Sequence, residues 1–133
     1  MIDIKWDKRY LLGNERIDLQ HHVFIDLIRS SSDAIDSHLD LEQTKRALEE
    51  LVLYAKFHFF SEETLMINSH YPKYELHREE HVQLEETLEK KIDEYMANKE
   101  TGEAFVEFIF EWFVVHTLYT DKEFIDYLNS HHA

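Results

Sequence analysis

Two pairs of residues in this chain have both the chemistry and the spacing of metal ligands. His58 and Glu62 stand four residues apart in "HFFSE", and His77 and His81 stand four residues apart in "HREEH". Side chains at positions i and i+4 lie one above the other on a helix, so each pair can bind a single cation. Either pair alone can arise by chance, and its meaning depends on its surroundings.

The first pair lies on a helix face that should be apolar. Hydrophobic residues recur around it at the spacing of one buried stripe: Leu48, Leu51, Val52, Ala55, Phe59, Leu65 and Met66. A buried carboxylate is costly unless it is paired, hydrogen-bonded or bound to a metal. The pattern therefore indicates that Glu62 points inward toward a cation or a strong partner.

Three more residues extend this set. His21 and His116 lie on the apolar stripes of two other expected helices, and Asp121 follows His116 by five residues. That spacing suits a helix end that bends and brings the carboxylate back toward the site. The candidate metal ligands are therefore His21, His58, Glu62, His77, His81, His116 and Asp121, whereas surface or loop positions are expected for His22, His38, His70, His131 and His132.

The composition favours a single domain built from a few long helices. The chain has 133 residues with only two glycines and one proline, too few for the many turns of an all-β fold. It has no cysteine, which excludes disulfides, thiolate metal sites and iron–sulfur clusters. Its net charge of −14 argues against binding to nucleic acid or to anionic membranes.

The same features predict the cellular context. The first residues lack the basic-then-apolar order of a signal peptide. No apolar run approaches the roughly 18 residues of a membrane span. We expect a soluble cytoplasmic protein, and the acidic surface favours a monomer.

The expected fold is all-α, an antiparallel up-down four-helix bundle with an N-terminal arm and a short C-terminal helix. Residues 1–14 form the arm, which Trp6 lays against the bundle, and residues 15–133 form the bundle. Helices are expected over about 16–37, 41–68, 73–98 and 103–118, with a tail helix from Asp121. Asp40 caps the second helix and Pro72 breaks the chain before the third. Tyr119 should continue the inward stripe of the fourth helix.

The donor set points to two transition-metal ions. Five imidazoles and two carboxylates exceed one tetrahedral zinc site, and calcium and magnesium prefer all-oxygen sites. Iron, manganese and copper remain, and iron suits oxygen chemistry best. If Glu62, Asp121 and an oxide or hydroxide bridge two irons, the five histidines divide three and two. One iron is then six-coordinate, and the other keeps a position open for a small diatomic molecule.

The motifs together resemble the hemerythrins, and the bacterial single-domain hemerythrins most closely. The matching segments are "KW", "GNERIDLQH", "HFFSEETLM", "YPKYELHREEH" and "EWFVVHTLYTD", which extend over nearly the whole chain. The resemblance implies that His77, His81 and His116 bind the six-coordinate iron, that His21 and His58 bind the other iron, and that Glu62 and Asp121 bridge the two.

The resemblance also implies an O2 pocket formed by Phe24, Phe59, Trp112 and Phe113. Members of the family usually have aliphatic residues in place of Phe24 and Phe113, and isoleucine in place of Thr117. The two phenylalanines suggest a tighter pocket than is usual. Plain core packing is part of the role of all these aromatic residues.

Reversible O2 binding is the first functional hypothesis, for storage, delivery or supply, and the protein is then not an enzyme. NO and small anions are other possible ligands of the same site. The alternatives are sensing of O2, NO or redox state, and a di-iron oxidoreductase activity. A bundle without a metal is the fourth interpretation, and it predicts no bound iron after purification.

Overall fold

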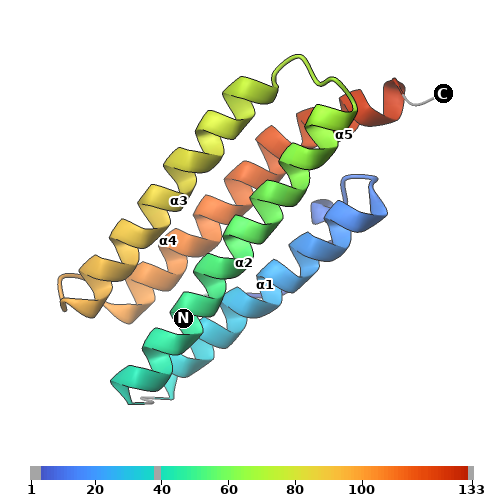
Figure 1. Cartoon of the computed structure of the whole chain (residues 1–133). Coiled ribbons are helices and arrows are strands. Elements are labelled where there is room, and N and C mark those ends of the chain that lie inside the picture. Colours follow the sequence, from blue (N-terminus) through green and yellow to red (C-terminus); the bar gives the residue numbers. More distant parts are fainter. Residues whose placement is uncertain (1–3, 38–39, 132–133) are drawn as a thin grey trace.

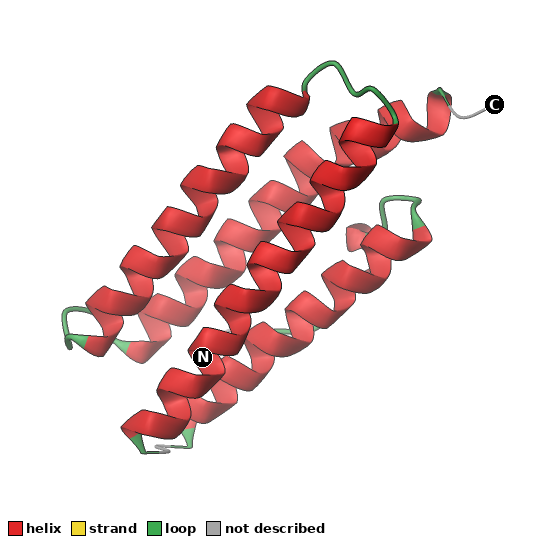
Figure 2. Ribbon diagram, viewed as in Figure 1, coloured by secondary structure: helices red, strands yellow, loops and turns green. Residues whose placement is uncertain are grey.

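The computed structural model describes residues 4–37 and 40–131 of the chain. A short 3₁₀ turn (Lys8–Tyr10) precedes four long helices, α1 (Glu15–Asp36), α2 (Leu41–Asn68), α3 (Tyr74–Met96) and α4 (Gly102–Val115) (Figure 1). A π-helical segment, η2 (His116–Asp121), joins α4 to the terminal helix α5 (Lys122–Ser130). The described residues contain no strand (Figure 2), which confirms the predicted all-α class.

The four long helices form a closed antiparallel bundle. Each packs against two neighbours, because α1 contacts α2, α2 contacts α3, α3 contacts α4, and α4 contacts α1. Short turns join consecutive helices, so the chain direction alternates around the ring, as Figure 1 shows. The predicted up-down topology is confirmed. Among the described residues, no helix has the length and apolarity that crossing a membrane requires.

Side-chain caps define where most of these helices begin. Asn14, Asp40 and Thr101 precede α1, α2 and α4, and the side chain of each accepts a hydrogen bond from the backbone N–H three residues later. This satisfies one of the N–H groups that a helix start leaves unpaired. The capping role predicted for Asp40 is confirmed. Pro72 lies in the turn before α3, also as predicted.

The N-terminal arm packs along the bundle. Ile4, Tyr10 and Leu12 are buried, and the ring of Trp6 lies 4.8 Å from that of His22 on α1. These contacts confirm that Trp6 helps to hold the arm against the helices. The arm adds apolar contact without contributing a candidate metal ligand.

The end of the fourth helix differs from the prediction. α-Helical structure stops at Val115, and the chain continues as the π-helical segment η2. The extra residue in a π turn rotates the side chains that follow. Tyr119 is consequently 73% exposed, and its predicted place on the inward stripe was wrong. The other predicted helix ends lie within two residues of those observed.

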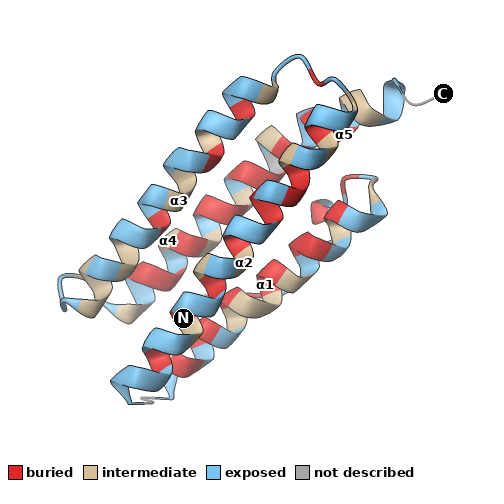
Figure 3. Cartoon of the chain, viewed as in Figure 1, coloured by how far each residue is buried: buried red, intermediate tan, exposed pale blue. Residues whose placement is uncertain are grey.

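A polar layer divides the buried interior into two apolar clusters. The larger cluster includes Phe24, Leu51 and Ile109, and the smaller one includes Ile17 and Phe124 near α5. Buried positions follow the inner face of each helix (Figure 3). The candidate ligands lie between the clusters, since on α1 the sequence passes from Ile17 through His21 to Phe24.

Candidate metal centre

All the predicted ligands meet in the polar layer of the bundle. α1 contributes one histidine, α2 a histidine and a glutamate, α3 two histidines, and η2 a histidine and an aspartate. None of them is more than 4% exposed: His21, His58, Glu62, His77, His81, His116 and Asp121. The structure therefore brings together every residue that the sequence selected.

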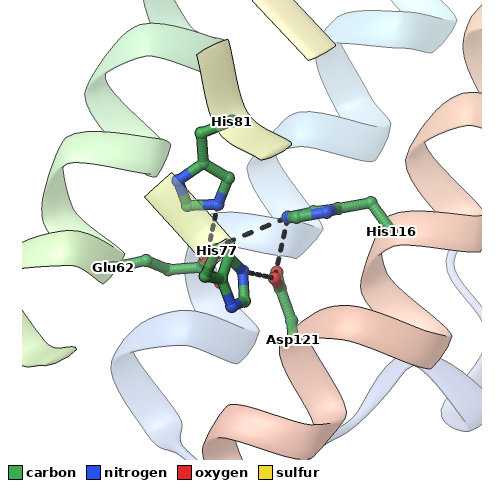
Figure 4. Close-up of side chains that lie close together, drawn as sticks. All are labelled: Glu62, His77, His81, His116 and Asp121. Atoms are coloured by element: carbon green, nitrogen blue, oxygen red, sulfur yellow. Dashed lines mark hydrogen bonds and ion pairs between the residues drawn. The ribbon is translucent and has the colours of Figure 1, made fainter. Parts of the chain in front are cut away.

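Three histidines surround one side of the two carboxylates (Figure 4). Nε2 of His81 lies 3.1 Å from Oε1 of Glu62, and Nε2 of His77 lies 3.7 Å from the same oxygen. Oδ1 of Asp121 lies 2.8 Å from Nε2 of His116 and 3.2 Å from Nε2 of His77. We call this group the three-histidine half.

The other two histidines face the opposite oxygens of the same carboxylates. Oδ2 of Asp121 lies 2.8 Å from Nε2 of His21 and 3.6 Å from Nε2 of His58. Oε2 of Glu62 lies 3.6 Å from Nε2 of His58 and 3.9 Å from Nε2 of His21. In this two-histidine half, as in the other, every imidazole presents Nε2. Glu62 and Asp121 thus each turn one oxygen toward each half.

The distances between these donor atoms suit ligands around two cations better than hydrogen bonds between the donors. Ligand bonds of about 2.1 Å, typical of histidine and carboxylate on a transition metal, place neighbouring donors about 3 Å apart. The contacts above run from 2.8 to 3.9 Å. Both oxygens of Glu62 and Nε2 of His81 and His116 are buried and make only such ion-pair contacts, with no hydrogen bond of regular geometry among the described residues. Such atoms are expensive to bury unless a ligand satisfies them.

Burial keeps two of the imidazoles in the form that binds cations. Burial lowers the pKa of His58 to about 3. Burial, followed by the charges of His116 and His77, lowers the pKa of His81 to about 2. Both rings are therefore neutral at physiological pH, and a neutral imidazole nitrogen can donate its lone pair to a metal.

The remaining charge is concentrated on three residues. Burial, and then the charge of Asp121, raises the pKa of Glu62 well above its usual value. Burial disfavours the charged forms of His116 and Asp121, but the two opposite charges stabilise each other. Asp121 therefore raises the pKa of His116, and His116 lowers the pKa of Asp121. The metal-free centre thus holds one proton on Glu62 and an additional one on His116, and bound cations would displace both.

Hydrogen bonds outside the centre orient two of the rings. Nδ1 of His58 donates to Oε1 of Gln20 at 2.8 Å, and Nε2 of Gln20 donates to the hydroxyl of Ser61 at 3.0 Å. Nδ1 of His81 donates to Oε2 of Glu63 at 2.7 Å. Partners of this kind fix the tautomer of a histidine and leave Nε2 free for the metal.

A third ring has a partner of the same kind. Oε1 of Glu80 lies 3.4 Å from Nδ1 of His116 and accepts a hydrogen bond from Thr120 at 3.0 Å. Sequence reasoning missed all three partners, Gln20, Glu63 and Glu80. Each adjoins a selected ligand in the sequence, but a polar residue beside a buried histidine on a helix usually faces solvent, so adjacency alone gives no signal.

Aromatic side chains cover the two-histidine half. The ring of Phe113 lies 5.5 Å from that of His21, and the ring of Phe24 lies 4.9 Å from Phe113 and 6.2 Å from His58. All four of these side chains are buried. The structure therefore places Phe24 and Phe113 beside the two-histidine half.

Of the other two predicted wall residues, Phe59 contacts histidines of both halves, and Trp112 contacts the other aromatic residues. Phe59 stacks on His81 with ring centroids 4.2 Å apart, and it also contacts His116. Trp112 packs against Phe24 and Phe59 at 5.8 and 6.2 Å. Phe59 supports a ligand ring, and Trp112 joins the two parts of the wall.

Histidines outside the set behave as expected where they are described. His22, His70 and His131 are exposed. His38 and His132 lie outside the described residues.

Comparison with known proteins agrees with this arrangement. The family model described as "Hemerythrin HHE cation binding domain" matches residues 12–132. The chain belongs to the hemerythrin family. The resemblance drawn from the motifs is thereby confirmed, and a cation-binding role fits the buried donors.

Individual relatives within the hemerythrin family are distant but match over almost their full length. A bacteriohemerythrin of Clostridium acetobutylicum is 27% identical over 128 residues, which cover 91% of this chain and 98% of that protein. Hemerythrin-like proteins of Naegleria gruberi and Naegleria fowleri are each 27% identical over 119 residues, covering 90% of this chain and 88% of theirs.

Proposed function

We propose that this hemerythrin binds two iron ions, bridged by Glu62, Asp121 and an oxide or hydroxide, and that it binds O2 reversibly. The observation that carries the proposal is the division of oxygens: each carboxylate presents one oxygen to the three-histidine half and the other to the two-histidine half. Carboxylates divided in this way act as bridges between two cations.

The unequal number of histidines supports the two-histidine half as the side on which a ligand binds. The three-histidine half offers three nitrogens, two carboxylate oxygens and the shared bridge, which complete six positions. The two-histidine half offers one donor fewer, so a sixth position stays open beside His21 and His58. Bound there, two iron ions would supply the reversible exchange of electrons with O2 that side chains cannot provide.

The residues around the open position favour binding over turnover. Phe24 and Phe113 cover the two-histidine half, where His21 and His58 are no more than 1% exposed. The buried imidazoles of His58 and His81 have pKa values far below neutrality, so they do not deliver protons at physiological pH. We therefore propose a binding protein rather than an enzyme. From the acidic composition, with its net charge of −14, we also propose that it works as a monomer in the cytoplasm.

The direct test is a spectrum taken through cycles of O2 removal and return. Protein reconstituted with iron should contain two irons per chain, and its visible absorption should bleach and recover over several cycles. His21→Ala should abolish the recovery, whereas His22→Ala, which changes the exposed neighbour, should not. A chain that binds no iron would refute the proposal, and sustained consumption of O2 or peroxide over many turnovers would replace it with an oxidoreductase.

A further inference from the structure

One buried hydroxyl beside the centre has no partner in the described structure. The side chain of Thr117 is 0% exposed, and its Oγ1 accepts and donates no hydrogen bond. A threonine within a helix commonly donates to the carbonyl one turn back, and Thr117 does not. Burying an unsatisfied hydroxyl destabilises a protein. A group retained at such a cost is a candidate for contact with a ligand.

The position of Thr117 directs it toward the two-histidine half. It lies in η2, between Phe113 at the end of α4 and Asp121, and the buried side chains of all three face the interior. Both of these neighbours contact His21, Phe113 through ring packing at 5.5 Å and Asp121 through a 2.8 Å approach to Nε2. Thr117 therefore lies between two residues that border the open position.

The two phenylalanines that cover this side offer no hydrogen bond to a ligand. Phe24 and Phe113 are hydrocarbon, and the Nε2 atoms of His21 and His58 point toward the carboxylates. A hydrogen-bond donor would stabilise a ligand that carries negative charge at this buried site. The Thr117 hydroxyl is a donor without a partner, and its side chain is buried between Phe113 and Asp121 in the sequence.

We propose that Thr117 Oγ1–H donates a hydrogen bond to the small ligand held in the two-histidine half and thereby slows its release. The hydroxyl keeps its proton, and no covalent bond forms or breaks. The ligand class is a diatomic such as O2 or a small anion such as azide. This inference rests on the proposed function, because it requires the two-iron centre.

Thr117→Val tests the inference, because valine keeps the shape of threonine and removes the hydroxyl. In the metal-free protein the melting temperature should rise by about 3 °C, since an unsatisfied polar group disappears. In the iron-loaded protein the iron content should stay the same, and azide should dissociate about three- to tenfold faster in stopped flow. Thr117→Ser, which keeps the hydroxyl, should release azide as slowly as the wild type.

Thr64→Val is the matched control. Thr64 is exposed on α2, and its hydroxyl donates to the Phe60 carbonyl at 3.0 Å. The substitution removes a hydroxyl of the same kind at a distance from the pocket, so azide release should not change. This control shows whether a faster release is specific to Thr117 or follows from any loss of a threonine hydroxyl.

Three results would overturn the inference. A lower melting temperature in metal-free Thr117→Val would show that the hydroxyl has a structural partner. Unchanged azide release in a variant with full iron content would refute the Thr117 contact while leaving the proposed function intact. Faster release in Trp112→Phe alone would assign the donor to the indole Nε1, another buried donor without a partner among the described residues. Wild-type protein that takes up no iron on reconstitution would instead refute the proposed function.

Discussion

Replacing Glu62 with methionine should stabilise the metal-free protein and weaken the metal-loaded one. Both oxygens of Glu62 are fully buried without a hydrogen bond, and burial beside Asp121 raises the pKa of this carboxyl. An unsatisfied buried polar group costs about 1–3 kcal/mol. Methionine has similar length and no group that needs a partner. The metal-free variant should therefore gain about 1–3 kcal/mol in its free energy of unfolding.

The loaded protein should show the opposite sign. A cation present at about 100 times its dissociation constant stabilises the folded state by about 2.7 kcal/mol, so two cations contribute about 5 kcal/mol. Glu62 presents an oxygen to each half, and its loss removes one ligand from both cations. Most of the stabilisation by metal should consequently disappear in the Glu62→Met variant.

Urea unfolding followed by far-ultraviolet circular dichroism would measure both effects. Wild type and Glu62→Met would be compared after chelation and again at a fixed excess of ferrous iron without oxygen. The curves of the two proteins should exchange order between the two conditions. A metal-free variant that is less stable than wild type, together with a full response to iron, would show that Glu62 is a structural residue and not a bridge.

Three further substitutions or conditions address other parts of the centre. Gln20→Leu removes the acceptor for His58 Nδ1 and should weaken cation binding about 10–100-fold in a calorimetric titration, whereas Gln20→Glu should retain binding. Phe113→Leu widens the pocket and should speed ligand exchange in stopped flow; unchanged rates would show that Phe113 does not line it. Because Glu62 and His116 have raised pKa values, loading at neutral pH should release one proton from each, so affinity should fall as pH decreases, and an indicator dye in weak buffer would reveal the release.

The ligands could be found from the sequence because helix periodicity separates inside from outside. His58 and Glu62 interrupt an apolar stripe whose other members are all suited to a core. A carboxylate at such a position has few physical solutions, and a metal is one of them. Once an up-down bundle is assumed, alternating chain direction brings the inward histidines of four helices to one level. The structure then adds the division of carboxylate oxygens, which spacing cannot specify.

The supporting residues could not be found in the same way. Gln20, Glu63 and Glu80 occupy positions beside inward residues, where a charged or amide side chain usually extends into water. Whether such a side chain turns back to a histidine Nδ1 depends on rotamers and on the neighbouring helix. Their contribution is a property of the packed bundle and becomes visible only in the hydrogen bonds.

The five-residue interval between His116 and Asp121 is compatible with two local geometries, a bend and a widened helical turn. In an α-helix five residues rotate about 500°, so the two side chains would diverge by about 140°. A bend can correct this divergence, but so can a turn widened by one residue, in which residue i+5 returns over residue i. The chain uses the widened turn, which keeps η2 continuous with α4 and α5 and directs both ligands inward. Because the same rotation turns Tyr119 outward and leaves Thr117 buried, one local change in helical geometry accounts for the failed prediction, for the inward direction of Asp121 and for the unpartnered hydroxyl.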